Sequence, residues 1–213
     1  MVTTEMHLPQ PLPGFESINR FWDKRMNVAA AKILPGEFYV STQGEMIGTV
    51  LGSCISACVR DKVIGVGGMN HFMLPSKGSN GTDNWGGSEV SASLRYGNWA
   101  MEYLINEILK AGGKRSNFEI KIFGGGQVLS NMTDIGSRNI DFVRAYLLRE
   151  GLQVHAEDVG DVFPRKVLYF PDTGAVKMKK LRSIHNQTIA QRERQYIRNI
   201  ADTPPSAGEV ELF

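Results

Sequence analysis

Cys54 and His71 are the two side chains of this sequence whose types and spacing suit covalent catalysis. Cys54 follows Gly52 and Ser53 where one strand-like run stops and another starts, and glycine there permits close approach of a substrate. Cysteine is the strongest nucleophile among side chains at neutral pH, and a positioned histidine raises its thiolate fraction. Cys54 and His71 lie on successive strand-like runs, so an antiparallel hairpin would bring them side by side.

Each of these residues, taken alone, also fits a structural role. Free cysteines usually act as small buried hydrophobes, and we expect this of Cys58, which lies in the apolar run SACV. A histidine in an apolar run such as MNHFMLP is often a hydrogen-bonded core residue. The pair indicates catalysis more strongly than either residue does alone.

A cysteine–histidine pair supports several acyl-transfer reactions. The thiolate attacks a carbonyl carbon, and backbone amides hold the developing oxyanion; here the amides of Ser53 and Cys54 are the candidates. The imidazolium then protonates the leaving group, and water hydrolyses the thioester. A leaving amine within a chain defines a protease, ammonia from glutamine a deamidase, and replacement of water by an amine a transglutaminase. The spacing of the two residues does not choose among these reactions.

Composition narrows the class of protein. The chain has 213 residues, of which 42% are hydrophobic, and this is enough for one core with extensions. Its net charge of +2 gives no reason to expect nucleic-acid binding. No apolar stretch approaches the ~20 residues of a membrane span, and the N-terminus lacks the pattern of a signal peptide. We therefore expect a cytoplasmic protein with no membrane insertion.

The two cysteines do not predict a disulfide or a metal site. Cys54 and Cys58 would lie ~13 Å apart on a strand, which is beyond the reach of a disulfide. No further soft or imidazole ligands occur at local spacing. At least one of the two thiols is therefore free for a structural or a catalytic role.

The predicted elements alternate irregularly between strands and helices. We expect an irregular arm over 1–30 and a polar glycine-rich loop over 76–88, with a flexible tail in the last dozen residues. Helical spacing of apolar residues predicts helices over 89–111, 137–150 and 186–200. Strands are predicted over 37–41, 46–52, 55–61, 63–75, 119–126, 153–158 and 166–171, and the last of these begins a hairpin with AVKMKKL. This order predicts an α+β fold in which mostly antiparallel sheets are covered by helices in layers.

Two of these segments have features of their own. The third helix has an apolar stripe of Ile189, Tyr196, Ile197 and Ile200, with arginines on its other side. The triglycine at 124–126 lacks the flanking residues of a phosphate-binding loop, so we interpret it as a sharp turn after a strand.

Several motifs, in order along the chain, resemble the chemoreceptor glutamine deamidase family, CheD. They are KILPGEFYVS (32–41), TVLGSCISACVRD (49–61), GGMNHFMLP (67–75), RYGNWAMEYLINEILKAG (95–112), KIFGGG (121–126), IGSRN (135–139) and PRKVLYFPDTGAVKMKKL (164–181). The combination of GSC, HFMLP, RYGN and FGGG in this order is highly specific. The resemblance implies a deamidase domain over 31–182 and a C-terminal helix and tail over 183–213.

The resemblance also implies a reaction and a fold. Members of this family hydrolyse glutamine side chains of methyl-accepting chemotaxis receptors to glutamate, releasing ammonia through a cysteine thioester. By this resemblance Cys54 is the nucleophile and His71 the base, and no metal or organic cofactor is used. The fold implied is a layered α/β sandwich similar to bacterial toxin deamidases.

The third catalytic group implied by the family is a threonine about six residues before the cysteine. That register falls on Gly48, and Thr49 one position further on is the nearest candidate. The partners implied are the cytoplasmic domains of the receptors and, in some bacteria, a CheC-type phosphatase. Because a glycine, Gly48, stands where the family has its threonine, an alternative stays open. In that alternative the protein is an adaptor that binds receptors or the phosphatase and has little catalysis.

Overall fold

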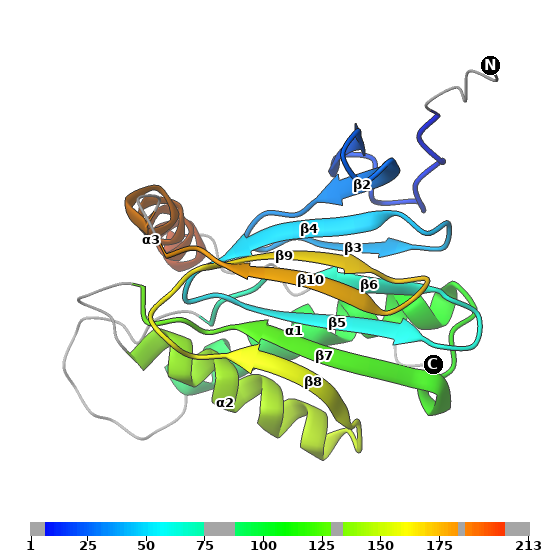
Figure 1. The fold of residues 1–213 in the computed structure, drawn as a ribbon. Helices are drawn as coiled ribbons and strands as arrows, with labels where there is room; N and C mark the ends of the chain where they lie inside the picture. Colours follow the sequence, from blue (N-terminus) through cyan, green and yellow to red (C-terminus); the bar gives the residue numbers. More distant parts are fainter. Residues whose placement is uncertain (1–6, 75–87, 129–133, 183–185, 203–213) are drawn as a thin grey trace.

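Two five-stranded sheets form the body of the protein (Figure 1). The computed structural model describes residues 7–74, 88–128, 134–182 and 186–202. In spatial order, the first sheet consists of β1 (Asn19–Asp23), β2 (Val28–Lys32), β4 (Met46–Leu51), β9 (Arg165–Phe170) and β10 (Ala175–Lys180). The second consists of β3 (Phe38–Ser41), β6 (Gly67–Asn70), β5 (Ile55–Asp61), β7 (Phe118–Gly124) and β8 (Val154–Val159). Neighbouring strands are antiparallel except for the pairs β2–β4 and β7–β8.

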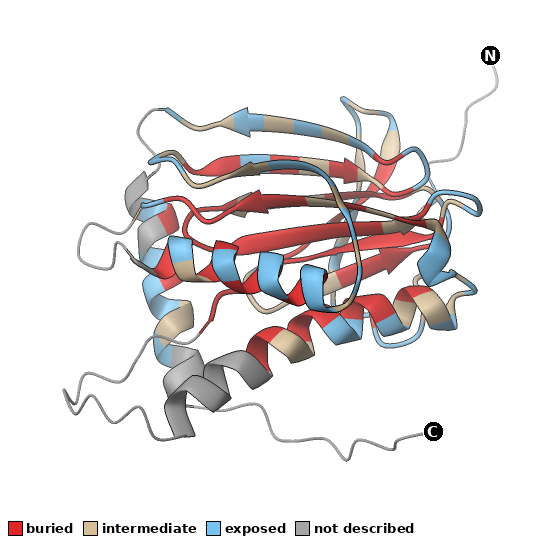
Figure 2. Ribbon diagram, turned by 90° about the horizontal axis from the view of Figure 1, so that it is seen from below, coloured by how far each residue is buried: buried red, intermediate tan, exposed pale blue. Residues whose placement is uncertain are grey.

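Helices cover the second sheet. Both α1 (Ser88–Lys110) and α2 (Asp134–Arg149) contact its strands, and a 3₁₀ turn at Arg115–Asn117 leads from α1 into β7. Figure 2 shows that these helices turn buried faces towards the strands and exposed faces outwards. The apolar residues predicted on α2, Ile140, Val143 and Leu147, are all buried. The α+β prediction of layered sheets and helices is therefore confirmed.

One core joins the layers. Buried side chains of the first sheet, such as Ile47 and Tyr169, belong to the same hydrophobic cluster as Ala57 of β5 and Leu104 of α1. Strand β5 is buried along almost its whole length, because helices cover one of its faces and the first sheet the other. Within the described residues, no helix is long and apolar enough to cross a membrane.

The prediction of an irregular arm over 1–30 is wrong for the second half of that range. Strands β1 and β2 form an antiparallel hairpin there, and β2 pairs in parallel with β4. The sequence VAAAK of β2 has little β propensity, since alanine is depleted in strands, but its three alanines are buried against the sheet. Upstream, Phe15 is 4% exposed and packs edge-on against Phe38 and Tyr39. This segment therefore belongs to the folded body.

The strand expected over 63–75 is shorter in the structure. Its regular part is β6 alone, and the residues before it form a turn in which the Asp61 carboxylate accepts hydrogen bonds from the amides of Val63 and Ile64. Val63 is 70% exposed in this turn. The other predicted strands and helices occur within a few residues of their expected bounds. Nearly all of the predicted tail lies outside the described residues, and so does nearly all of the loop expected over 76–88.

Candidate active site

The loop from Gly52 to Cys54 joins β4 to β5 and places the cysteine at the start of a central strand. Its three carbonyl oxygens all accept hydrogen bonds from the protein interior. The donors are the amide of Gly126 for Gly52 (2.8 Å), the side-chain amide of Asn139 for Ser53 (2.8 Å) and the amide of Gly125 for Cys54 (2.7 Å). The carbonyls of Gly52 and Ser53 turn inwards, so the N–H groups of the same two peptides, which belong to Ser53 and Cys54, face the opposite side.

The glycine turn expected at 124–126 supports the cysteine loop, because the amides of Gly125 and Gly126 donate to its carbonyls. Gly124 has a φ of 113°, and a Cβ atom there would overlap the carbonyl oxygen of Cys54. A side chain at this position would therefore push the cysteine loop away. Asn139 adds a second anchor from α2, because its side-chain oxygen also accepts the amide hydrogen of Leu74 (2.9 Å), close to His71. Asn139 is fully buried and holds the cysteine and histidine segments together.

His71 follows β6 and lies beside the cysteine strand. The hairpin expected from the sequence is present, because β5 and β6 pair antiparallel and the pairing continues to a bridge between Ile55 and Phe72. In this register Cys54 and His71 are diagonal neighbours on one side of the sheet. Cys54 is fully buried and His71 is 2% exposed. Cys58 is also buried, as predicted for a core residue.

Thr49 of β4 orients the histidine ring. Its Oγ1 lies 2.8 Å from Nδ1 of His71 and 2.8 Å from the carbonyl oxygen of Ile33. A carbonyl oxygen only accepts, so the hydroxyl hydrogen goes to Ile33 and His71 Nδ1–H donates to Thr49. The lone pair of the neutral ring is then on Nε2, and this buried atom has no hydrogen-bond partner in the described part of the chain. Gly48, where the family register fell, has no side chain to offer the ring; Thr49 makes this contact.

The site is electrically neutral in this arrangement except for one carboxylate. Burial lowers the pKa of His71 to about 3, so the ring is uncharged at neutral pH and its Nε2 carries a lone pair. Burial also raises the pKa of the Cys54 thiol well above its usual value, and the charge and hydrogen bond of Glu193 raise it further. The resting cysteine is therefore a thiol.

Glu193, like Asn139, is a site residue that the sequence analysis missed. It lies on α3 (Asn186–Asp202), and its carboxylate contacts the amide side of the cysteine loop. Oε1 accepts from the amides of Gly52 (3.0 Å) and Cys54 (3.2 Å), and Oε2 accepts from the amide (3.0 Å) and hydroxyl (2.6 Å) of Ser53. The two amides predicted as an oxyanion hole thus converge, with a third, on one anionic group. We call these three N–H groups, of Gly52, Ser53 and Cys54, the amide nest.

The sequence did carry a signal for this residue. Glu193 is four residues after Ile189 and four before Ile197, so it falls within the apolar stripe predicted for the helix. It is 2% exposed, whereas Arg192 and Arg194 beside it are exposed. An acidic residue at the centre of an apolar stripe needs a buried partner.

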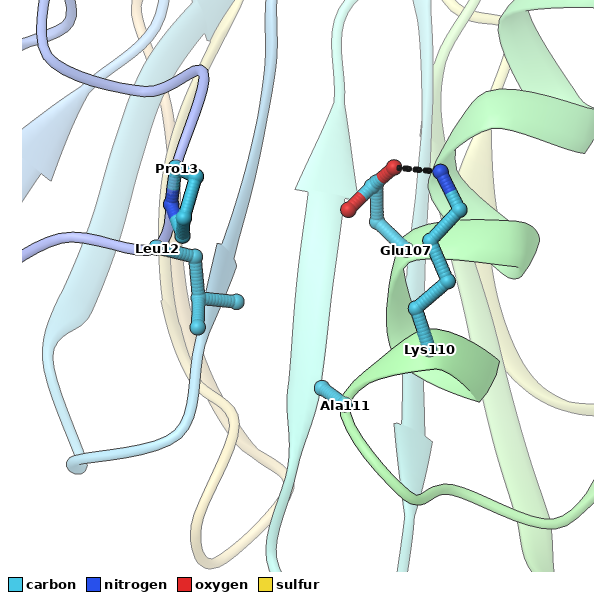
Figure 3. A pocket seen from close by; sticks show the side chains of 5 residues that line it. All are labelled: Leu12, Pro13, Glu107, Lys110 and Ala111. Atoms are coloured by element: carbon cyan, nitrogen blue, oxygen red, sulfur yellow. Dashed lines mark hydrogen bonds and ion pairs between the residues drawn. The ribbon is translucent and has the colours of Figure 1, made fainter.

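A cavity of about 370 Å³ lies away from the cysteine loop (Figure 3). The described residues that line it include neither a cysteine nor a histidine. It lies between Leu12 and Pro13 of the N-terminal segment and the last turn of α1. Its charged groups, Glu107 and Lys110, are paired with each other. The cysteine loop therefore remains the candidate active site.

The fold and the geometry together define a class of protein. A thiol, a neutral histidine with a free Nε2 and a nest of backbone amides are the parts needed for attack on a carbonyl carbon and for stabilisation of the resulting oxyanion. This is an α+β protein whose candidate site holds the groups that acyl transfer through a cysteine would require.

Comparison with known proteins gives the family. Residues 73–180 match the family model described as CheD chemotactic sensory transduction. The chain is 53% identical over 206 residues to a protein of Halorhodospira halophila, covering 97% of this chain and 94% of that protein. It is 52% identical over 209 residues to a protein of Hahella chejuensis, covering 96% and 97%. Both relatives are named probable chemoreceptor glutamine deamidase CheD. The chain belongs to the CheD family.

Proposed function

We propose that this protein hydrolyses the side-chain carboxamide of glutamine residues in methyl-accepting chemotaxis receptors, giving glutamate and ammonia. The substrate class follows from the family, since its relatives are named probable chemoreceptor glutamine deamidases. The reaction is supported above all by one observation: the carboxylate of Glu193 accepts hydrogen bonds from the whole amide nest beside the thiol. A glutamate side chain is the product of glutamine deamidation, so the site accommodates the group that this reaction forms.

The groups of the site account for each step of the proposed reaction. His71 Nε2 takes the thiol proton, and the sulfur of Cys54 attacks Cδ of the glutamine side chain. The amide nest stabilises the negative oxygen of the tetrahedral intermediate. The imidazolium gives its proton to the departing nitrogen, which leaves as ammonia, and a thioester remains on Cys54. His71 then removes a proton from water, the resulting hydroxide attacks the thioester carbon, and the thiolate leaves and is reprotonated.

The geometry favours a side-chain amide over a peptide bond. Glu193 meets the nest with its side-chain carboxylate, and the hydrogen bonds between α3 and the loop go to that carboxylate. The slot is narrow, because a Cβ atom on Gly52 would lie 2.6 Å from Glu193 Oε1. A protease would have to admit a main chain with substituents on both sides of the scissile bond, whereas a deamidase admits one side-chain end.

Mass spectrometry of a receptor fragment tests this proposal. The cytoplasmic fragment is incubated with wild-type protein and with the Cys54→Ala variant, and peptides are mapped. We expect the mass increase caused by replacing –NH₂ with –OH, confined to glutamines and absent with the variant. Chain cleavage would show a protease, and incorporation of an added amine would show a transglutaminase. Receptor binding without any mass change would overturn the proposal in favour of the adaptor.

A further inference from the structure

Helix α3 is bound to the active site at more than one point. Besides Glu193 in the amide nest, Tyr196 one turn further on lies against the backbone of Gly36, where a Cβ atom would be 2.8 Å from its hydroxyl oxygen. The hydroxyl groups of Tyr196 and Tyr96 share a hydrogen bond. Ile189 on the preceding turn is 8% exposed. One face of the helix therefore packs against the site. Figure 1 shows α3 at one end of the layered sheets, near the C-terminal end of β4.

This helix closes the access to the nucleophile. Cys54 has no exposed surface, and the Glu193 carboxylate accepts a hydrogen bond from its backbone amide. All three amides of the nest are engaged by the same carboxylate. A glutamine side chain therefore cannot reach its position for attack while α3 is in place.

We propose that α3 is a built-in product analogue, which occupies the glutamine-binding site in cis, and that the substrate glutamine likewise reaches this site from a helix. The inference rests on the proposed function, because it equates the position of Glu193 with that of the product glutamate. Glutamate and glutamine side chains have the same length and shape. A substrate glutamine placed like Glu193 would accept at its carbonyl oxygen from the amides of Gly52 and Cys54, and its –NH₂ group would face the hydroxyl and the N–H of Ser53. The hydroxyl can accept from –NH₂, whereas the Ser53 N–H is left without an acceptor.

Glu193 of α3 is suited to closing the access to Cys54 reversibly. Its carboxylate is better matched than a neutral carboxamide to a nest of N–H donors, since hydrogen bonds to charged groups are the stronger ones. As part of the same chain, α3 competes at a high effective concentration. The opposite face of the helix carries exposed arginines, Arg192, Arg194 and Arg198, so one face alone attaches it. A receptor helix must displace α3 before its glutamine is hydrolysed.

Alkylation of Cys54 tests the closure without requiring any catalysis. Full-length wild type, Glu193→Ala and Arg194→Ala are treated with iodoacetamide, and the rate of modification of each cysteine is followed by peptide mass spectrometry. We expect Glu193→Ala to raise the rate at Cys54 at least tenfold, and Arg194→Ala, an adjacent exposed site on the same helix, to change it less than twofold. Cys58, buried in the core, reports any general unfolding.

A second variant covers the case in which Glu193→Ala unfolds and both cysteines react. Tyr196→Phe removes the hydroxyl contact with Tyr96 and leaves the amide nest untouched. We expect it to raise the Cys54 rate severalfold while Cys58 stays slow. An unchanged Cys54 rate in both variants, or in whichever of them remains folded, would overturn the closure.

The Glu193→Gln variant tests the product-analogue claim. If α3 binds as a substrate does, the glutamine placed at position 193 is converted to glutamate by the same chain, and Cys54→Ala in addition abolishes the conversion. No conversion in a protein that still deamidates the receptor fragment would overturn the claim. Failure on both the variant and the fragment would instead overturn the proposed function, and the alkylation rates would then decide the closure alone.

Discussion

The most informative substitution at this site is Thr49→Val. Valine has nearly the shape of threonine, so the strand and the packing stay the same, but the hydroxyl is lost. In the native protein that hydroxyl donates to the carbonyl of Ile33 and accepts from Nδ1–H of His71, both at 2.8 Å. It thereby keeps the lone pair of the ring on Nε2. The substitution therefore separates ring orientation from every other property of the site.

The structure sets the size of the effect. The change leaves two buried groups, the Ile33 carbonyl and His71 Nδ1–H, without partners, and each costs about 1–3 kcal/mol. The free energy of unfolding should fall by about 2–6 kcal/mol. Turnover should fall further than stability explains, since a ring protonated on Nε2 cannot accept the thiol proton. A general base contributes about 10²–10⁴-fold to rate, so we expect a loss of about 10²-fold or more in the rate constant for deamidation.

Two measurements on the folded variant test this reasoning. Urea unfolding gives the stability, and ammonia release from a receptor fragment, at a temperature where the variant is folded, gives turnover. Thr49→Ser is the matched control, because serine can make both hydrogen bonds, and it should retain most of the activity. A Thr49→Val variant with wild-type turnover would refute the role of the threonine in fixing the tautomer. Equal losses in the serine and valine variants would point to packing instead.

Three further perturbations follow from the same geometry. Asn139→Leu should lower the free energy of unfolding by about 2–6 kcal/mol in urea titrations, because two buried backbone groups lose their partner. Wild-type stability would show that water replaces the side chain. Gly124→Ala should abolish turnover and destabilise the protein, while Gly151→Ala, with a φ of 65° but nothing within 4 Å, should cost about 1 kcal/mol; similar results for the two would disprove the close approach at the cysteine loop. The pKa of the buried His71 is about 3, against an ordinary 6.5, so as the pH falls the unfolded chain is protonated at this residue before the folded protein is. Its contribution to the free energy of unfolding is therefore complete above pH 6.5 and is lost as the pH falls towards 3. At about 1.4 kcal/mol per pH unit this contribution is at most about 5 kcal/mol. Urea unfolding at several pH values should show that the free energy of unfolding of His71→Asn lacks this part of the pH dependence seen in the wild type.

Local patterns predicted those parts of the site that lie close together in the chain. Cys54 and His71 lie on successive strand-like runs, and the hairpin that would bring such runs together is present in the structure. The amides of Ser53 and Cys54 follow from the position of the cysteine in a glycine-containing loop. Thr49 was suggested by the resemblance, yet only the structure shows why the fifth residue before the cysteine, and not the sixth, contacts the ring.

The missed parts come from distant segments. Glu193 lies 139 residues from the Cys54 amide it contacts, and Asn139 lies 86 residues from the Ser53 carbonyl. No local periodicity encodes such contacts, because they depend on how α2 and α3 pack after the sheets have formed. The hairpin of β1 and β2 was missed for a related reason, since its alanines become a strand through pairing with β4 and not through their own propensity.

An amide nest beside a thiol has a consequence that links catalysis to closure. A cluster of fixed N–H groups stabilises a developing oxyanion because it is already oriented towards negative charge, and the same property makes it bind carboxylates. The product of glutamine deamidation is a carboxylate, so the better the nest serves the transition state, the more strongly it retains its product. Glu193 fits this situation, since a carboxylate held in cis competes with the product for the same three amides. Return of α3 after each turnover would then help to expel the product, and it would cover the thiol until the next receptor helix arrives.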